Sequence, residues 1–277
     1  MEARLSLSWS EGRACFAHPV YDPVRRALEP LAAQAEWPDC DRLNALAAEL
    51  GQAPRARSGR HVRFVAPSAA KLGYESRVHA SGEVATRPQN WHDLFNALAW
   101  LAYPRTKGSL NALHASEPPV RGGRRGPMRD LLTIFDEGGA LVACSDAELL
   151  DLIRGFRWQT LFWTERQRVL EGMRILVFGH AVLEKALAPW SGITCKALLV
   201  PVEPSLIATG IETLTDVLDA AAAAWFDAHA RISAPRDLAP LPVFGYPGWS
   251  ENGAGPEFYA DPRIFRTPAQ PIAPRGR

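Results

Sequence analysis

Apolar residues recur every three or four positions along much of the chain, and this spacing predicts amphipathic helices. Leu214 and Leu218, for example, share one helical face. Asp22-Pro23 fits a helix start, because proline is favoured in the first helical turn. Ser145 and Glu148 have the spacing of a capping box, so a further helix should begin at Ser145. The other predicted helices cover residues 22–35, 41–50, 91–102, 105–114 and 211–230.

Shorter stretches follow the alternating apolar and polar pattern of β-strands. His61–Pro67 and Thr194–Val202 are predicted to be single strands. Tyr74–Thr86 and Leu131–Cys144 are predicted to be antiparallel hairpins, each with a glycine-containing turn near its centre. The strands are short compared with the helices, which favours an α+β protein that is mostly helical.

The last part of the chain, residues 231–277, is rich in proline and has little periodicity, yet it carries many aromatic residues. A disordered tail rarely holds so many aromatic side chains, so we expect an ordered, irregular wrap packed on the core. We therefore predict a single domain over residues 1–277, with an N-terminal helical segment (1–58), a core (59–230) and this tail. The aromatic residues of the tail are Phe244, Tyr246, Trp249, Phe258, Tyr259 and Phe265.

Composition excludes several classes of protein. The formal net charge of +1 argues against non-specific nucleic-acid binding, which usually needs a clear positive excess. The N-terminus has no signal pattern, and no apolar run approaches the roughly 20 residues that span a bilayer. Cys15, Cys40, Cys144 and Cys195 are too far apart for a thiolate zinc motif or a disulfide framework. We therefore expect reduced thiols in a cytoplasmic protein that does not contact membranes.

Polar residues gather on the two helices predicted within residues 90–114. His92 and Asn96 are four positions apart and share a face, and Asp93 lies beside them. Lys107, Asn111 and His114 form one stripe on the second helix. Pro104 ends the first helix, and a short turn there would let the two stripes converge on one pocket.

The same residues have purely structural interpretations, which the sequence leaves open. Asn90 is a good helix N-cap, and Asp93 could complement the helix N-terminus. His92 and His114 could be half-buried structural histidines, and Lys107 could be a solvated surface residue. If these groups are buried, however, each must find a polar partner.

Two other pairs are candidates for metal ligands. His180 and Glu184 are four apart on a predicted helix, so both could bind a metal, or the carboxylate could orient an imidazole. An ordinary helical pair explains the same spacing. Asp136 and Glu137 could supply carboxylates to a divalent ion, although a hairpin turn also favours such residues. The standard nucleophile, phosphate-loop and zinc-peptidase signatures are missing from the sequence.

Several strings resemble a bacterial family catalogued as domain of unknown function 3025. The most specific runs from Asn90 to Leu98 (NWHDLFNAL) and continues in Pro104–Lys107 and Leu110–His114. The resemblance extends from about Tyr74 to Phe265 and also includes the strings LTIFDE, FGHAVLEK and GYPGW. It implies one full-length domain and supplies no mechanism.

These observations favour a metal-assisted hydrolase. His92, Asp93 and His114, joined by His180 with Glu184 or by Asp136, would hold zinc, manganese or iron. The catalytic candidates are Lys107, Asn111 and Asn96, of which the first two would steady developing negative charge.

Two other functions stay open. A non-enzymatic protein could use the amide-rich stripe to recognise a small polar molecule or a partner chain. A nucleic-acid-processing enzyme is a weaker alternative, because residues 116–129 read as an exposed basic loop that includes Arg121, Arg124, Arg125 and Arg129.

Overall fold

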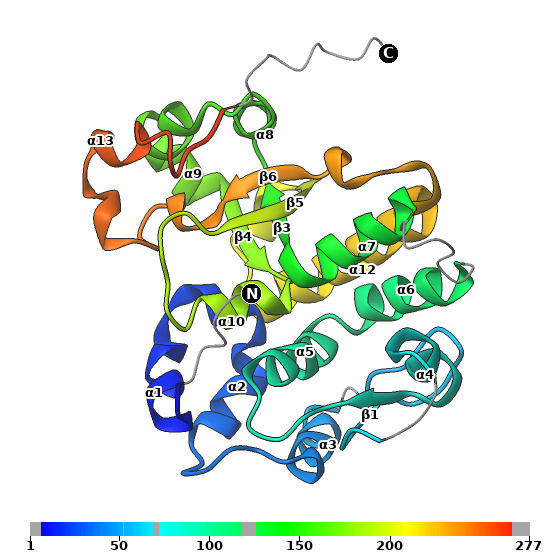
Figure 1. Ribbon diagram of the computed structural model, residues 1–277. Helices are drawn as coiled ribbons and strands as arrows, with labels where there is room; N and C mark the ends of the chain where they lie inside the picture. Colours follow the sequence, from blue (N-terminus) through cyan, green and yellow to red (C-terminus); the bar gives the residue numbers. More distant parts are fainter. Residues whose placement is uncertain (1–6, 52, 69–71, 118–125, 268–277) are drawn as a thin grey trace.

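Helices make up most of the chain in the computed structural model, which describes residues 7–51, 53–68, 72–117 and 126–267 (Figure 1). The α-helices are α1 (Trp9–Arg13), α2 (Arg25–Ala32), α3 (Cys40–Glu49), α4 (Tyr74–Ser81), α5 (Trp91–Ala102), α6 (Pro104–Ser116), α7 (Pro127–Gly138), α8 (Ala147–Arg154), α9 (Arg166–Gly172), α10 (His180–Lys185), α11 (Pro204–Ile207), α12 (Ile211–His229) and α13 (Pro256–Tyr259). The strands are β1 (Arg63–Val65), β2 (Glu83–Ala85), β3 (Gly139–Cys144), β4 (Met173–Val177), β5 (Thr194–Pro201) and β6 (Ala239–Pro242). Short 3₁₀ segments are η1 (Ala14–Ala17), η2 (Pro19–Val24), η4 (Ala230–Ile232), η5 (Pro235–Asp237), η6 (Val243–Gly245) and η7 (Glu251–Ala254), and η3 (Thr160–Thr164) is a π-helical turn. The mostly helical α+β class is confirmed.

A four-stranded mixed sheet with the order β4-β3-β5-β6 lies at the centre (Figure 1). The strand β3 pairs antiparallel with β4 and parallel with β5, and all six of its residues are buried. A strand buried on both faces must separate two layers of core. A second, smaller sheet consists of β1 and β2, which pair in parallel.

Two hydrophobic clusters lie on opposite faces of β3. Leu141 belongs to the cluster formed with α7 and α12, where the rings of Phe135 and Phe226 are 4.7 Å apart. Val142, the next residue, points into the larger cluster, which includes Phe95 of α5 and Leu150 of α8. The alternation of side chains along β3 thus sorts the surrounding helices onto two faces.

The helices α5 and α6 form as their sequences predict. The side chain of Asn90 accepts a hydrogen bond from the backbone N–H of Asp93, at 3.0 Å, and caps α5. The helix α5 ends before Pro104, which occupies the first position of α6. The structural role expected for Asn90 is therefore confirmed. The polar stripes of α5 and α6 lie on either side of the short turn at Tyr103.

Residues 239–267 form an ordered wrap over the larger cluster, as predicted, and residues 268–277 of the predicted tail lie outside the described part of the chain. The strand β6 extends the sheet by pairing antiparallel with β5. Beyond it, the Tyr246 hydroxyl donates to the carbonyl oxygen of Met173 at 2.9 Å, and the Trp158 indole donates to the carbonyl of Arg266 at 2.9 Å. Phe265 is 4 % exposed, so the wrap supplies core residues as well as cover.

Both predicted hairpins are wrong. Tyr74–Thr86 consists of α4 followed by β2, and Leu131–Cys144 consists of the end of α7 followed by β3. The helix α7 buries Leu131 and Phe135 on one face, so packing overrides the β-propensity of its Thr-Ile-Phe run. The strands that do pair antiparallel are not joined by hairpin turns. The helices α8 and α9 lie between β3 and β4, and the helices α11 and α12 lie between β5 and β6.

The predicted helix start at Ser145 is also wrong. The N-cap of α8 is Asp146, whose carboxylate accepts from the backbone N–H of Glu148 at 3.0 Å. The Ser145 hydroxyl instead donates to the carbonyl of Gly172.

Among the described residues, no helix is both long enough and apolar enough to cross a bilayer.

Candidate metal centre

A cleft of about 600 Å³ opens between α4, α5, α7 and α10. Its wall is unusually rich in titratable groups for a single hollow, which is a common property of functional sites. Imidazoles come from α5, α6 and α10, and four carboxylates and two guanidinium groups line the same cleft. These residues are His92, His114 and His180, Glu75, Asp93, Asp136 and Glu137, and Arg87 and Arg129.

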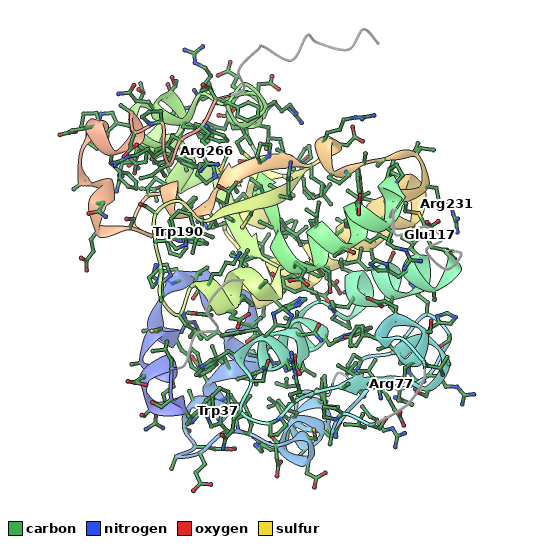
Figure 2. The ribbon with its side chains drawn as sticks, in the orientation of Figure 1. Trp37, Arg77, Glu117, Trp190, Arg231 and Arg266 are labelled. Atoms are coloured by element: carbon green, nitrogen blue, oxygen red, sulfur yellow. The ribbon has the colours of Figure 1, made fainter. Side chains whose placement is uncertain are left out.

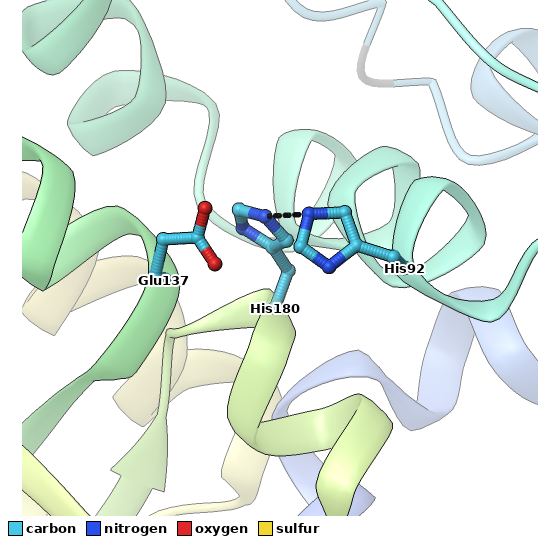
Figure 3. Close-up of side chains that lie close together, drawn as sticks. All are labelled: His92, Glu137 and His180. Atoms are coloured by element: carbon cyan, nitrogen blue, oxygen red, sulfur yellow. Dashed lines mark hydrogen bonds between the residues drawn. The ribbon is translucent and has the colours of Figure 1, made fainter. Parts of the chain in front are cut away.

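Two imidazoles meet in this cleft. The Nε2 atoms of His92 and His180 are 3.0 Å apart, and the two rings are inclined at 79° (Figure 3). Two nitrogen ligands of a tetrahedral zinc ion, each about 2.0–2.1 Å from the metal, are roughly 3.3 Å apart. The observed separation is close to this value. One ligand atom of Glu137 lies within 4.8 Å of both imidazoles, and its carboxylate points toward His180.

Close backbone contact explains why these residues meet. His180 is the first residue of α10, directly after Gly179, and Glu137 is next to the end of α7. A Cβ atom at Gly179 would lie 2.5 Å from the Glu137 carbonyl oxygen, so only glycine permits this approach. The Gly179 N–H donates to the carbonyl of Gly139 at 2.8 Å and holds the two turns together.

A carboxylate lies behind each imidazole. The Nδ1 atom of His92 is 2.9 Å from the carboxylate of Glu184, and Nδ1 of His180 is 3.7 Å from that of Asp136. The Glu184 carboxylate is at hydrogen-bond distance and orients the His92 ring, as carboxylates do for metal-binding histidines. The Asp136 carboxylate is beyond hydrogen-bond distance, and Nδ1 of His180 has no hydrogen-bond partner among the described residues. The two Nε2 atoms are hydrogen-bonded to each other.

The pKa values of the two histidines are shifted in opposite directions. Burial lowers the pKa of His180 to about 3, against the opposing effect of the Asp136 carboxylate. The hydrogen bond that His92 donates to the Glu184 carboxylate raises the pKa of His92 above its ordinary value, although burial opposes it. His180 is therefore neutral near pH 7, which is the form that binds metals.

A buried lysine holds Asp136 in place. Lys107, 3 % exposed, donates from Nζ to Asp136 at 2.6 Å and to the Asn96 side-chain oxygen at 2.8 Å. Asn96 in turn donates to the Tyr74 hydroxyl at 2.9 Å. Burial, the largest single influence, raises the pKa of Asp136, but the Lys107 ammonium together with the nearby imidazoles of His180 and His114 outweighs it and lowers that pKa below its usual value. The carboxylate facing His180 is thus kept ionised.

Glu75, which also lines the cleft, has a strongly raised pKa. Burial, reinforced by the negative charge of Asp136, raises the pKa of Glu75 to about 7. The Asn111 amide donates to its carboxylate at 2.7 Å and partly opposes this shift. A carboxyl group with a pKa near the working pH is suited to accept and return a proton.

The structure places the five predicted metal ligands differently. His92 and His180 meet, while His114 lines the same cleft outside the facing triplet. Glu184 lies behind His92, where it orients the ring instead of joining the facing ligand atoms. Asp93 forms an ion pair with the guanidinium of Arg87, with contacts of 2.7 and 2.8 Å. This pair lies at the N-terminal end of α5.

The catalytic candidates from sequence all contact protein groups. Lys107 and Asn96 belong to the buried Asp136 network, and Asn111 binds Glu75. Most of the predicted basic loop, including Arg121, Arg124 and Arg125, lies outside the described residues. Arg129 belongs to α7 and lines the cleft.

The sequence interpretation missed Glu75 and Tyr74, because Tyr74–Thr86 was interpreted as a hairpin without chemistry. It also missed Arg87, which follows that segment. It considered Glu137 and favoured a turn there. The useful signal for Glu137 was the helical spacing of Leu131, Leu132 and Phe135, which continues to the end of α7.

The family model described as "Protein of unknown function (DUF3025)" matches residues 62–269. The chain belongs to this family. No curated protein and no solved structure gives a significant match to the chain. The match to the DUF3025 model includes every residue of the metal centre described above, so the centre lies within the family domain.

Proposed function

We propose that the protein is a metal-dependent hydrolase whose divalent ion is held by His92 Nε2, His180 Nε2 and a carboxylate oxygen of Glu137. One observation carries the proposal: these three ligand atoms lie within 4.8 Å of one another, in a cleft. The carboxylate of Glu184 behind the His92 imidazole supports it, since metal-binding histidines usually have such a partner.

The ligand set favours zinc, with manganese or iron as further candidates. Two histidines and one carboxylate form the catalytic zinc sites of several hydrolases, and they also bind non-haem iron. Such an ion lowers the pKa of a bound water to about 7 and polarises the bond that is attacked. Three protein ligands leave positions for water and substrate.

The remaining groups of the cleft would serve this reaction in two ways. Glu75, with its pKa of about 7, would accept a proton from the attacking water and return it to the leaving group. Lys107, Asn96 and Asn111 would act as positioning residues, because each holds another polar side chain of the cleft. The substrate would be a small polar molecule. The spacing of the cysteines favours a cytoplasmic location, which we include in the proposal.

Metal analysis of untagged protein, purified without chelators, tests the proposal. We expect near-stoichiometric metal in the wild type and its loss in a His92→Ala, His180→Ala double variant that still folds by circular dichroism. The matched control is His229→Ala, which removes an exposed histidine of α12 and should leave the metal content unchanged. Folded wild-type protein that binds no zinc, manganese or iron after incubation with each would contradict the proposal.

A metal-free protein that binds a small polar molecule is the second candidate. The observation that favours it is the internal pairing of cleft charges, since Glu184 contacts His92, Asp136 contacts Lys107, and Asp93 contacts Arg87. Such pairs could form a complete polar network without an ion. Wild-type protein without metal affinity would favour this function over the hydrolase.

A further inference from the structure

A second, smaller hollow adjoins the proposed metal centre. It has a volume of about 250 Å³ and lies between the C-terminal end of α7, the helix α10 and the loop before β5. Glu137 lines both this hollow and the cleft. The two hollows are therefore neighbours that share one proposed metal ligand.

The same two helices form the walls of both hollows. On α7, Thr133 and Asp136 face the cleft, whereas Ile134 and Gly138 face the smaller hollow. On α10, His180 faces the cleft and Val182 faces the smaller hollow. Glu137 forms the ridge between them, so a molecule bound at the metal could extend across this ridge.

The smaller hollow carries exposed apolar side chains. Trp190 is 58 % exposed and Ile134 is 38 % exposed, and both line the hollow together with Val182 and Ile193. Exposed large hydrophobic residues are unremarkable when scattered, but they indicate a binding surface when they gather beside a polar site.

The indole of Trp190 is held in place. It lies on the loop between α10 and β5 (Figure 2). A Cβ atom at Gly192 would be only 1.8 Å from the Trp190 ring, so the ring packs directly on the glycine backbone. The Ile193 N–H donates to the Trp190 carbonyl at 3.2 Å and closes a tight turn. An aromatic ring presented in this way can contact a ligand with little loss of conformational entropy.

We infer that the smaller hollow binds an aromatic or branched aliphatic group of the substrate, next to the bond that is hydrolysed at the metal. This inference rests on the proposed function. Because Glu137 lines both hollows, an apolar group in the smaller one would lie beside the reacting group at the metal. Trp190, Ile134, Val182 and Ile193 then determine specificity.

Hydroxamates provide a test, because they bind metal ions and can carry different side groups. The full chain is first titrated with Co²⁺, and the affinities of acetohydroxamate and phenylacetohydroxamate are then measured from the Co²⁺ absorption spectrum. We expect the phenyl compound to bind about 10-fold more tightly to the wild type, because its ring is removed from water. In Trp190→Ala the preference should fall to about 2-fold or less, because most of the ring contact is lost.

The control variant is Leu170→Ala, which removes another exposed apolar residue, 39 % exposed, from α9. It should retain the full preference for the phenyl compound. Equal affinities for the two hydroxamates in Co²⁺-loaded wild type, or a preference that survives Trp190→Ala, would overturn the subsite and leave the metal centre intact. Failure of Co²⁺ to bind at all would overturn the proposed function and the subsite with it.

Discussion

Charged side chains that are largely removed from water dominate the cleft at the scale of single residues. Lys107 and Asp136 are buried together, and burial of a lone charge would be strongly unfavourable. Their pairing keeps both ionised, and the result is an oriented carboxylate behind His180. Perturbed titratable groups that converge in a hollow are more typical of a functional site than of a structural network.

Glu75 should make stability depend on pH. Its folded pKa, about 7, lies above the ordinary value of 4.5, so the folded protein holds this proton more tightly than the unfolded chain does. The stabilisation is complete below the unfolded pKa and is lost as the pH rises through about 7. Besides burial, four groups shift the pKa of Glu75. Asp136 raises this pKa, and Asn111, Lys107 and Arg129 lower it.

Replacing Glu75 by glutamine tests this dependence in the metal-free protein. Between pH 5 and pH 8 the wild type should lose as much as about 3 kcal/mol of stability relative to Glu75→Gln, because only the wild type must ionise a buried group. Urea unfolding at the two pH values measures the difference. Parallel pH profiles for the two proteins would show that Glu75 ionises normally in the folded state.

At the scale of elements, the position of α6 depends on α12. The carboxylate of Asp219, which is 0 % exposed, accepts from the backbone N–H groups of Arg105 at 2.9 Å and Thr106 at 2.8 Å. These donors belong to the first turn of α6, whose own N-cap residue, Tyr103, makes no side-chain cap. A residue more than one hundred positions away thus caps the helix that carries Lys107 and Asn111.

Asp219→Ala should therefore lower the free energy of unfolding by about 2–4 kcal/mol, because two helix N–H groups lose a charged acceptor in a buried place. Asp216→Ala is the matched control on the same helix. Its carboxylate is 57 % exposed and pairs with Arg105, so the loss should be about 0–1 kcal/mol. Denaturant unfolding of both variants measures the two losses in free energy of unfolding. Equal losses for Asp219→Ala and Asp216→Ala would refute the capping role of Asp219.

At the scale of the whole molecule, the C-terminal wrap completes both the sheet and the larger cluster. Without it, β5 loses its pairing with β6 and becomes an exposed edge. The cluster would also lose Phe244 and Phe265, which are 3 % and 4 % exposed.

A chain that ends after Ile232 should accordingly be insoluble or lack cooperative unfolding. A chain that ends after Thr267 keeps β6 and both phenylalanines, so it should retain cooperative unfolding. Expression level and thermal unfolding compare the two. Cooperative unfolding of the shorter chain would show that the wrap is dispensable for the core.

Local chemistry explains which elements were predictable. Asn90 caps α5 and Pro104 begins α6, and these residues act within one or two turns of the backbone they organise. The facing stripes follow from helical periodicity and a short turn, as the contact between Lys107 and Asn96 illustrates. The sequence by itself therefore determined the helices α5 and α6 and drew attention to their polar faces.

Only the tertiary structure decided how the metal centre is assembled. The Thr-Ile-Phe run before Asp136 suits a strand as well as a helix, and the surroundings of Phe135 select the helix. His92 and His180 are 88 positions apart, and their meeting depends on the close approach of Gly179 to the end of α7. Such contacts join distant segments through packing, which no local pattern of residues encodes.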